Sequence, residues 1–160
     1  MTVLVGRDAA DAAPKQTVRD QALDAVSGVL SGREWSAVTM AAVAREAGVS
    51  RQTLYNEFGS RKGMAVAYVT RFVDGLLAFV QERIDAHPGE IDAAVDDAMC
   101  GVFQIGMGDP VVINIVGPNP HRDLMGIVTI DGTPIMQRAA EGLAEILAMS
   151  VEEAHEFFDG

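Results

Sequence analysis

Apolar positions in the first half of the chain recur every three to four residues, which is the spacing of amphipathic helices. Thr39, Ser50 and Ser60 each stand directly before such a repeat, where a hydroxyl can cap a helix by accepting a backbone N–H. Gly32 follows the first repeat, and Pro88 lies shortly after the fourth. The pattern predicts four helices, over residues 15–32, 39–47, 50–58 and 60–86.

The second half continues the helical spacing with a higher share of apolar residues. A fifth helix is predicted over residues 90–106. Its apolar residues at helical spacing are Ile91, Val95, Met99, Val102 and Phe103. Asp109 and Pro110 then fit the N-cap and first position of a helix. The following VVINIV would favour a strand by its β-branched residues. Because no partner strands are visible elsewhere, it is interpreted as a short buried helix.

The last forty residues predict further helices. A loop at GPNPH precedes a short apolar segment over residues 124–130. Thr133 and Pro134 open a helix that extends to Ala148. Ser150 stands three residues before Glu153, the spacing of a capping box, so a separate short helix is expected over 151–158. The predicted fold class is therefore all-α.

The stretch AREAGVSRQTLYNEF, residues 44–58, joins two of the short helices through a glycine. A glycine inside a helix costs about 0.5–1 kcal/mol relative to alanine. In a tight turn, however, Gly48 can adopt a backbone conformation that is strained for other residues. Ala47 is small, so the two helices can approach closely. This arrangement predicts a helix-turn-helix motif.

The second helix of such a motif enters the major groove of DNA. Arg51 can pair with guanine and Gln52 with adenine, and Thr53 can contact a thymine methyl group or a phosphate. Side chains at the helix start and just beyond its end are suited to the phosphate backbone. The competing interpretation is a solvated polar helix, which the glycine turn and the caps disfavour. The predicted DNA-binding residues are Thr39, Ser50, Arg51, Gln52, Thr53, Tyr55, Asn56 and Lys62.

The segment TMAAVAREAGVSRQTLYNEFGSRKGM closely resembles the DNA-binding region of TetR-family transcriptional regulators. The matching positions are Thr39, Ala47-Gly48-Val49-Ser50, Leu54-Tyr55, Phe58 and Lys62. The resemblance covers about residues 15–70. It implies a homodimeric, ligand-responsive regulator, expected to be a repressor that leaves a palindromic operator when a small molecule binds.

Three features depart from the family pattern. Glu57 stands where His or Tyr is common, and its carboxylate would repel a phosphate unless Arg51 or Arg61 neutralises it. Gly63 stands where an acidic residue is common. The family also usually ends in two long helices that pair with a second subunit, whereas one long and one short helix are predicted here, which bears on the dimer interface.

The charge is divided unevenly along the chain. The net charge is −11, which taken alone disfavours binding to phosphates. Residues 1–64, however, carry eight Lys and Arg against seven Asp and Glu, and the rest carries four against sixteen. We expect three regions: a disordered tail over 1–13, a helix-turn-helix DNA-binding domain over 14–62, and a helical ligand-binding and dimerisation domain over 63–160.

The family resemblance implies that the C-terminal domain binds an inducer and dimerises. A compatible lining is formed by Met99, Phe103, Met107, Ile113, Met125, Met136 and Leu143. Methionine adapts its shape to irregular apolar ligands. The stretch SRQTLYNEFGSRKGMAVAYV is also similar to actinobacterial regulators of alkane oxidation, which favours a lipophilic ligand such as an alkane, a fatty acid or an acyl derivative. The alternative is that these side chains simply form the core.

Other classes of protein find little support in the sequence. No nucleophile elbow, phosphate-binding glycine loop or zinc-protease motif is present, so no enzyme is expected. Cys100 and the three histidines lack the spacing of metal ligands, and neither a metal nor a cofactor is predicted. The single cysteine fits a reducing cytoplasm. No apolar run of about 18 residues and no signal peptide is apparent, so no membrane span is expected.

A different hypothesis remains for the chain as a whole. It could be a truncated regulator that acts mainly as a small-molecule-binding or protein-interaction module. The intact set of Arg51, Gln52, Tyr55 and Lys62 disfavours the loss of DNA binding that this hypothesis requires.

Overall fold

The computed structural model describes residues 16–116, 118, 121–129 and 132–158, so the predicted tail lies outside the described residues. Every regular element in these ranges is helical, which confirms the all-α prediction. The elements are α1 (Val18–Leu30), the 3-10 turn η1 (Trp35–Ala37), α2 (Met40–Ala47), α3 (Arg51–Phe58), α4 (Arg61–Asp85), α5 (Ile91–Gly108), α6 (Pro110–Val116), α7 (Arg122–Thr129) and α8 (Thr133–Phe158).

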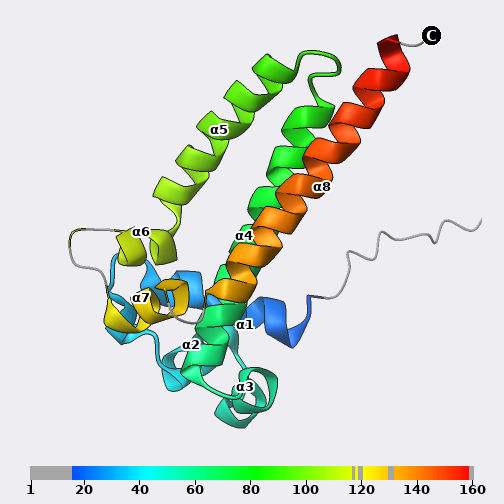
Figure 1. The fold of residues 1–160 in the computed structure, drawn as a ribbon. Coiled ribbons are helices and arrows are strands. Elements are labelled where there is room, and N and C mark those ends of the chain that lie inside the picture. Colours follow the sequence, from blue (N-terminus) through cyan, green and yellow to red (C-terminus); the bar gives the residue numbers. More distant parts are fainter. Residues whose placement is uncertain (1–15, 117, 119–120, 130–131, 159–160) are drawn as a thin grey trace, which may run out of the picture.

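The short helices gather at one end of the long ones (Figure 1). There α1 packs against α2, and α2 packs against α3. Helix α6 lies against α1, and α7 lies against α4. The long helix α4 leaves this cluster, with α8 along one side and α5 along another. One continuous helix therefore connects the N-terminal cluster to the far end of the molecule.

The predicted caps define the helix starts. Thr39, Ser50 and Ser60 each accept a hydrogen bond from the amide three residues further on, at 3.0 to 3.1 Å. Asp109 Oδ1 accepts the amides of Val111 and Val112 at 2.8 and 3.1 Å, and α6 begins at Pro110. These bonds satisfy amides that have no partner within the helix.

The main hydrophobic core joins the N-terminal helices to parts of the C-terminal half. It contains Trp35 and Leu54 from the N-terminal cluster, and Val111, Leu124 and Ile127 from α6 and α7, all at most 2% exposed. A second, smaller cluster of Ile84, Ala94 and Ile146 lies towards the far end of the long helices. Helices α6 and α7 thus share one core with the helix-turn-helix.

The predicted break between the last two helices is wrong. Helix α8 continues from Thr133 to Phe158 without interruption. No glycine or proline separates Ala148 from Val151, so nothing forces the chain out of the helix. The capping-box spacing at Ser150 is compatible with helix interior as well as with a helix start.

The apolar residues that define the helical spacing of α5 do not form a buried face. Four of these five residues are exposed by 43 to 70%: Ile91, Val95, Met99 and Phe103. The buried side chains of α5 are Ala94 and Ala98. A Cβ atom at Gly101 would lie 2.2 Å from the ring of Phe79 on α4. Because α4 supplies the large side chains at this contact, the close approach requires small residues on α5, and the large ones face outwards.

Helix α4 is the one described helix that is long and apolar enough to cross a membrane by length and composition. Within the described chain, 28% of this apolar window is buried. Arg71 and Asp74, in the middle of α4, form ion pairs with Asp24 on α1 and Arg138 on α8. Helices α1, α5, α7 and α8 all contact α4, as expected of the central helix of a bundle.

Candidate nucleic-acid interface

The turn between α2 and α3 has the glycine geometry that the sequence predicts. Gly48 has φ +68° and ψ +26°, in the left-handed region. The amide of Val49 donates to the carbonyl of Ala44 at 3.0 Å and closes the end of α2. A residue with a Cβ atom is strained in this conformation, so Gly48 allows the sharp change of direction.

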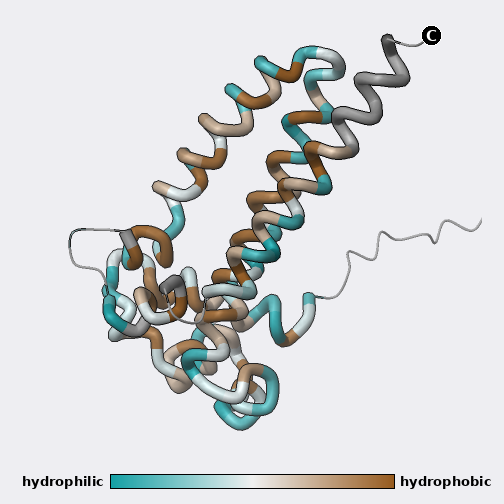
Figure 2. The backbone as a smooth tube through the Cα atoms, in the orientation of Figure 1, coloured by the Kyte–Doolittle hydropathy of each residue, from teal (hydrophilic) through white to brown (hydrophobic). Residues whose placement is uncertain are grey.

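Helix α3 is held by two apolar residues and is polar elsewhere. Leu54 and Phe58, one turn apart, are 0 and 9% exposed and belong to the main core. Figure 2 shows α3 as a predominantly hydrophilic segment at the lower end of the molecule. Since the buried pair fixes the rotation of the helix, the remaining face is presented to solvent in a defined orientation.

The polar side chains of α3 are partly pre-aligned. Gln52 Nε2 donates to Asn56 Oδ1 at 2.9 Å, which leaves the Gln52 carbonyl and a second amide hydrogen for another partner. The hydroxyls of Ser50 and Thr53 lie 2.8 Å apart. Within the described part of the chain, no hydrogen bond or ion pair engages the exposed guanidinium of Arg51.

All eight predicted DNA-binding residues lie on α3, its N-cap, the N-cap of α2 or the first turn of α4. Seven are exposed and Thr53 is half-buried. Tyr55 is 49% exposed. The structure therefore gathers the set at the surface of one motif, and contact with DNA remains a prediction for each member.

Glu57 is neutralised by a residue that was not predicted. Arg19 of α1 places its Nη1 atom 3.0 Å from Glu57 Oε1, and its guanidinium lies 5.3 Å from the centre of the Phe58 ring. The expected partners, Arg51 and Arg61, do not form this pair. Arg19 precedes Glu57 by 38 residues, so only the tertiary fold brings the two charges together. The negative charge on α3 is thereby compensated locally.

Arg61 instead supports the loop before α2. Its Nε atom donates to the carbonyl of Val38 at 2.6 Å, and its Nη2 atom donates to that of Trp35 at 2.7 Å. The guanidinium also lies over the Trp35 ring, 5.1 Å from its centre. Charged donors make strong hydrogen bonds to carbonyls. Arg61 therefore ties the start of α4 to the segment that leads into Thr39.

The predicted ligand-lining residues lie on the surface of the described chain. They are 37 to 70% exposed and come from four helices: Met99, Phe103 and Met107 from α5, Ile113 from α6, Met125 from α7, and Met136 and Leu143 from α8. The described chain does not enclose them, because α5 packs through its small residues and turns its large ones away from α4. Their role in ligand binding remains a prediction.

The candidate metal ligands are dispersed. His87 Nε2 lies 3.3 Å from Asp97 Oδ2, and Cys100 is exposed on α5. The side chain of His155 lies outside the described residues. Over the described ranges, no three His, Cys, Asp or Glu side chains are grouped as a metal site would need.

A substitution at Gly63 tests how closely the end of α3 packs against the start of α4. A Cβ atom at Gly63 would lie 2.1 Å from the carbonyl oxygen of Phe58. We expect Gly63→Ala to force the end of α3 away from α4, to lower stability by about 1–3 kcal/mol and to weaken any DNA binding. The measurements are thermal unfolding and DNA titration.

The matched control is Gly75→Ala in the same helix, where a Cβ atom meets nothing within 4 Å. This change should stabilise the protein, since alanine favours a helix by about 0.5–1 kcal/mol over glycine. Equal melting temperatures for Gly63→Ala and the unchanged protein would contradict the proposed close contact.

A glycine turn, a buried anchor and an exposed polar helix, at one end of an all-helical bundle, define a helix-turn-helix regulator. Residues 22–68 match the family of bacterial regulatory proteins, tetR family, and residues 90–157 match the bacterial tetracyclin repressor C-terminal domain. The chain belongs to the TetR family of DNA-binding transcriptional regulators, which is not a family of enzymes.

Individual relatives agree with this assignment. The HTH-type transcriptional regulator AlkX of Mycobacterium tuberculosis is 41% identical over 132 residues, which cover 82% of this chain and 63% of the relative. The crystal structure of the TetR family repressor AlkX from Dietzia sp., implicated in biodegradation of n-alkanes, matches with a TM-score of 0.69 and 34% identity. That match covers 85% of this chain and 79% of the other. The chain spans less than two thirds of the length of the mycobacterial regulator.

Proposed function

We propose that this chain is a repressor that binds a palindromic operator through α3 and leaves it when a lipophilic molecule binds. The observation that carries the proposal is that α3 is held in one orientation and exposes its polar side chains. Leu54 and Phe58 fix its orientation, while Arg51 is exposed and uncommitted within the described residues. A helix so presented fits the major groove, where arginine can recognise guanine through two hydrogen bonds. A DNA-binding role would place the protein in the cytoplasm.

An apolar stripe on α8 supports a homodimer. Ile135 and Ile146 of α8 are buried. A different face exposes Met136, Ala140, Leu143 and Leu147, each about one turn from the next. An exposed stripe of this kind is typical of a helix that packs against another copy. Pairing through α8 would let two α3 helices enter successive major grooves, roughly 34 Å apart.

The outward face of α5 supports a lipophilic ligand. Met99, Phe103 and Met107 are 55 to 70% exposed, and Figure 2 shows apolar residues along the length of α5. Burial of such surface by an alkane, fatty acid or acyl chain would be favourable by about 25 cal/mol per Å². The association of the Dietzia repressor with n-alkane biodegradation points to the same ligand class. The two DNA-binding domains of a dimer can adopt more than one relative orientation. A ligand that binds best to an orientation that does not fit the operator would shift the protein population off DNA.

Selection from a pool of random duplex DNA tests the DNA-binding role. Purified, ligand-free protein is incubated with the pool at moderate salt, and the retained duplexes are sequenced. A palindrome with half-sites one helical turn apart would support a dimeric operator-binding regulator. Absence of any enriched sequence from folded, dimeric, ligand-free protein would contradict the proposal.

Lys62→Ala should weaken binding to all duplexes alike. Lys62 is exposed in the first turn of α4, immediately after α3. A lysine on a phosphate contributes counterion release, so its loss should reduce the slope of log affinity against log salt by about one per contact. Titrations at several salt concentrations on operator and scrambled duplex would measure this. A loss confined to the operator would show that Lys62 contacts bases instead.

A further inference from the structure

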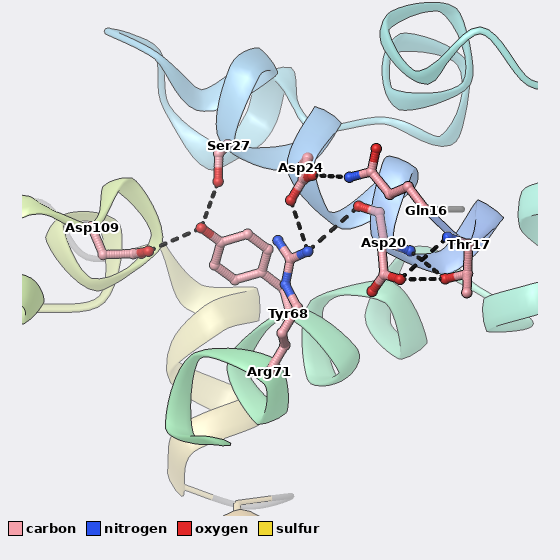
Figure 3. Close-up of polar contacts among 8 residues, drawn as sticks. All are labelled: Gln16, Thr17, Asp20, Asp24, Ser27, Tyr68, Arg71 and Asp109. Atoms are coloured by element: carbon pink, nitrogen blue, oxygen red, sulfur yellow. Dashed lines mark hydrogen bonds and ion pairs between the residues drawn. The ribbon is translucent and has the colours of Figure 1, made fainter. Parts of the chain in front are cut away.

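Three elements from different parts of the chain meet at the hydroxyl of Tyr68 (Figure 3). Tyr68 lies on α4 and is 5% exposed. Its hydroxyl oxygen is 2.7 Å from Ser27 Oγ on α1 and 2.9 Å from Asp109 Oδ2 at the start of α6. Ser27 and Asp109 each lie 41 residues from Tyr68. One atom thus links a helix of the DNA-binding motif to the N-terminus of α6.

The hydrogen bonds through this atom have one direction. Burial raises the pKa of Tyr68 to about 12, so the phenol keeps its proton at neutral pH. Through this proton the Tyr68 hydroxyl donates a hydrogen bond to Asp109 Oδ2. A hydroxyl has a single hydrogen, so the bond to Ser27 must be donated by the serine. The order is Ser27 to Tyr68 to Asp109, and removal of the tyrosine oxygen breaks both links at once.

Asp109 carries the connection into α6. Its Oδ2 atom accepts from Tyr68, while its Oδ1 atom accepts the amides of Val111 and Val112, the N-cap bonds of α6. Further along α6, Asn114 Oδ1 accepts the amide of Trp35 at 3.0 Å. Helix α6 is therefore bonded at its start to Tyr68 of α4, and through Tyr68 to α1, and one turn later it is bonded to the amide of Trp35.

We propose that Tyr68 is a positioning residue whose hydroxyl couples the orientation of the DNA-binding head, through Ser27, to the N-terminus of α6, through Asp109. The proposal rests on the DNA-binding function proposed above. Displacement of α6 would pull on α1 through two short bonds, and DNA that fixes α1 would hold α6 in return, because coupling between sites is reciprocal.

Replacement of Tyr68 by Phe isolates the hydroxyl from the other contacts of the residue. Arg71 lies over the Tyr68 ring at 5.7 Å and pairs with Asp24 of α1 at 2.8 Å. A phenylalanine ring preserves the packing and the stacking with Arg71. The Arg71–Asp24 ion pair between α4 and α1 therefore remains, and the two hydrogen bonds of the hydroxyl, with Ser27 and with Asp109, are lost.

Amide hydrogen exchange of the intact protein tests the coupling without DNA. Exchange at Val111 and Val112 is compared in the unchanged protein, in Ser27→Ala, in Tyr68→Phe and in the double variant. Ser27→Ala should speed exchange of these α6 amides, although it lies on α1. In the Tyr68→Phe background the same serine change should have no further effect there. This non-additivity is the mark of a contact relayed through the tyrosine oxygen.

A matched control is Thr70→Val, which also removes a hydroxyl from α4. Thr70 Oγ1 donates to the carbonyl of Val66 within the helix, so its loss should leave α6 unchanged. An equal effect of Ser27→Ala in both backgrounds would overturn the proposal. So would faster exchange of the α6 amides in Thr70→Val, because the effect would then reflect general loosening of α4.

A second measurement adds the selected operator duplex. In the unchanged protein, bound DNA should slow exchange of the α6 amides several-fold. Tyr68→Phe should still bind the duplex but lose this protection. Binding with protection undiminished in Tyr68→Phe would overturn the coupling. Failure of the unchanged protein to bind any duplex would count against the proposed function. The hydrogen-exchange comparison of the Ser27 and Tyr68 variants without DNA would still test the coupling through the tyrosine hydroxyl.

Discussion

Arg51→Ala is expected to abolish discrimination between the operator and altered sequences at one base pair of each half-site. Arg51 is the first residue of α3, the end of a recognition helix that approaches the base edges most closely. A two-pronged arginine contact to guanine contributes about 1–3 kcal/mol of discrimination, and a dimer would lose it in both half-sites. Binding to scrambled DNA should change far less.

Titration of Arg51→Ala with operator, scrambled duplex and operators altered one base pair at a time measures this effect. The alanine variant should bind all bases equally at one position and retain its preference elsewhere. Lys62→Ala is the companion variant, because it removes a charge of the same sign from the same motif. If Arg51→Ala lowered binding to every duplex equally, Arg51 would be a phosphate contact and the base-recognition role would be wrong.

The helix-turn-helix could be predicted because its determinants are local. Thr39 and Ser50 cap the amides three residues ahead, and Gly48 provides the left-handed turn between them. Each of these features depends on neighbours within one helical turn. Sequence spacing alone therefore specified both the elements and their bounds, and the placement of Arg51 on the solvent-facing side of α3 followed from the buried Leu54 and Phe58.

The inner face of α5 could not be predicted in the same way. Hydrophobicity favoured burial of Met99 and Phe103, but the choice of face depends on what α4 presents. Phe79 fills the space at Gly101, so close packing takes the small residues of α5. A helix that is apolar on several sides offers more than one candidate face, and its partner determines which is used.

The polar contacts that span the chain were equally beyond sequence patterns. Arg19 neutralises Glu57, although Arg51 and Arg61 are nearer in sequence. Tyr68 joins Ser27 to Asp109 across 41 residues in each direction. Ordinary serines, tyrosines and aspartates carry no spacing signal. Only the packing of α1, α4 and α6 around one core gives these residues their partners.

Trp35→Ala is expected to cause the largest loss of stability of any single change considered. Trp35 is 1% exposed, and Arg61 lies over its ring. Truncation of a buried tryptophan to alanine typically costs about 3–5 kcal/mol, through lost apolar burial and the cavity left behind. That is a large share of the 5–15 kcal/mol typical of a whole protein.

Urea unfolding followed by circular dichroism measures the change, because Trp35 is the sole tryptophan and its fluorescence disappears with it. Trp35→Phe keeps an aromatic ring beneath Arg61 and should lose clearly less stability. A loss below about 1 kcal/mol in Trp35→Ala would contradict the central position of this side chain in the core.

The consequence of Trp35→Ala should extend beyond the helix-turn-helix. Trp35 shares one core with Val111 of α6 and Leu124 of α7, and its amide is bonded to Asn114. Hydrogen exchange in α6 and α7 should therefore accelerate together with exchange in α2, as expected when elements open as one cooperative unit. If α6 and α7 kept their protection while α2 lost it, the head would unfold independently. The proposed coupling between α6 and the DNA-binding helices requires that α6, α7 and α2 lose their protection together.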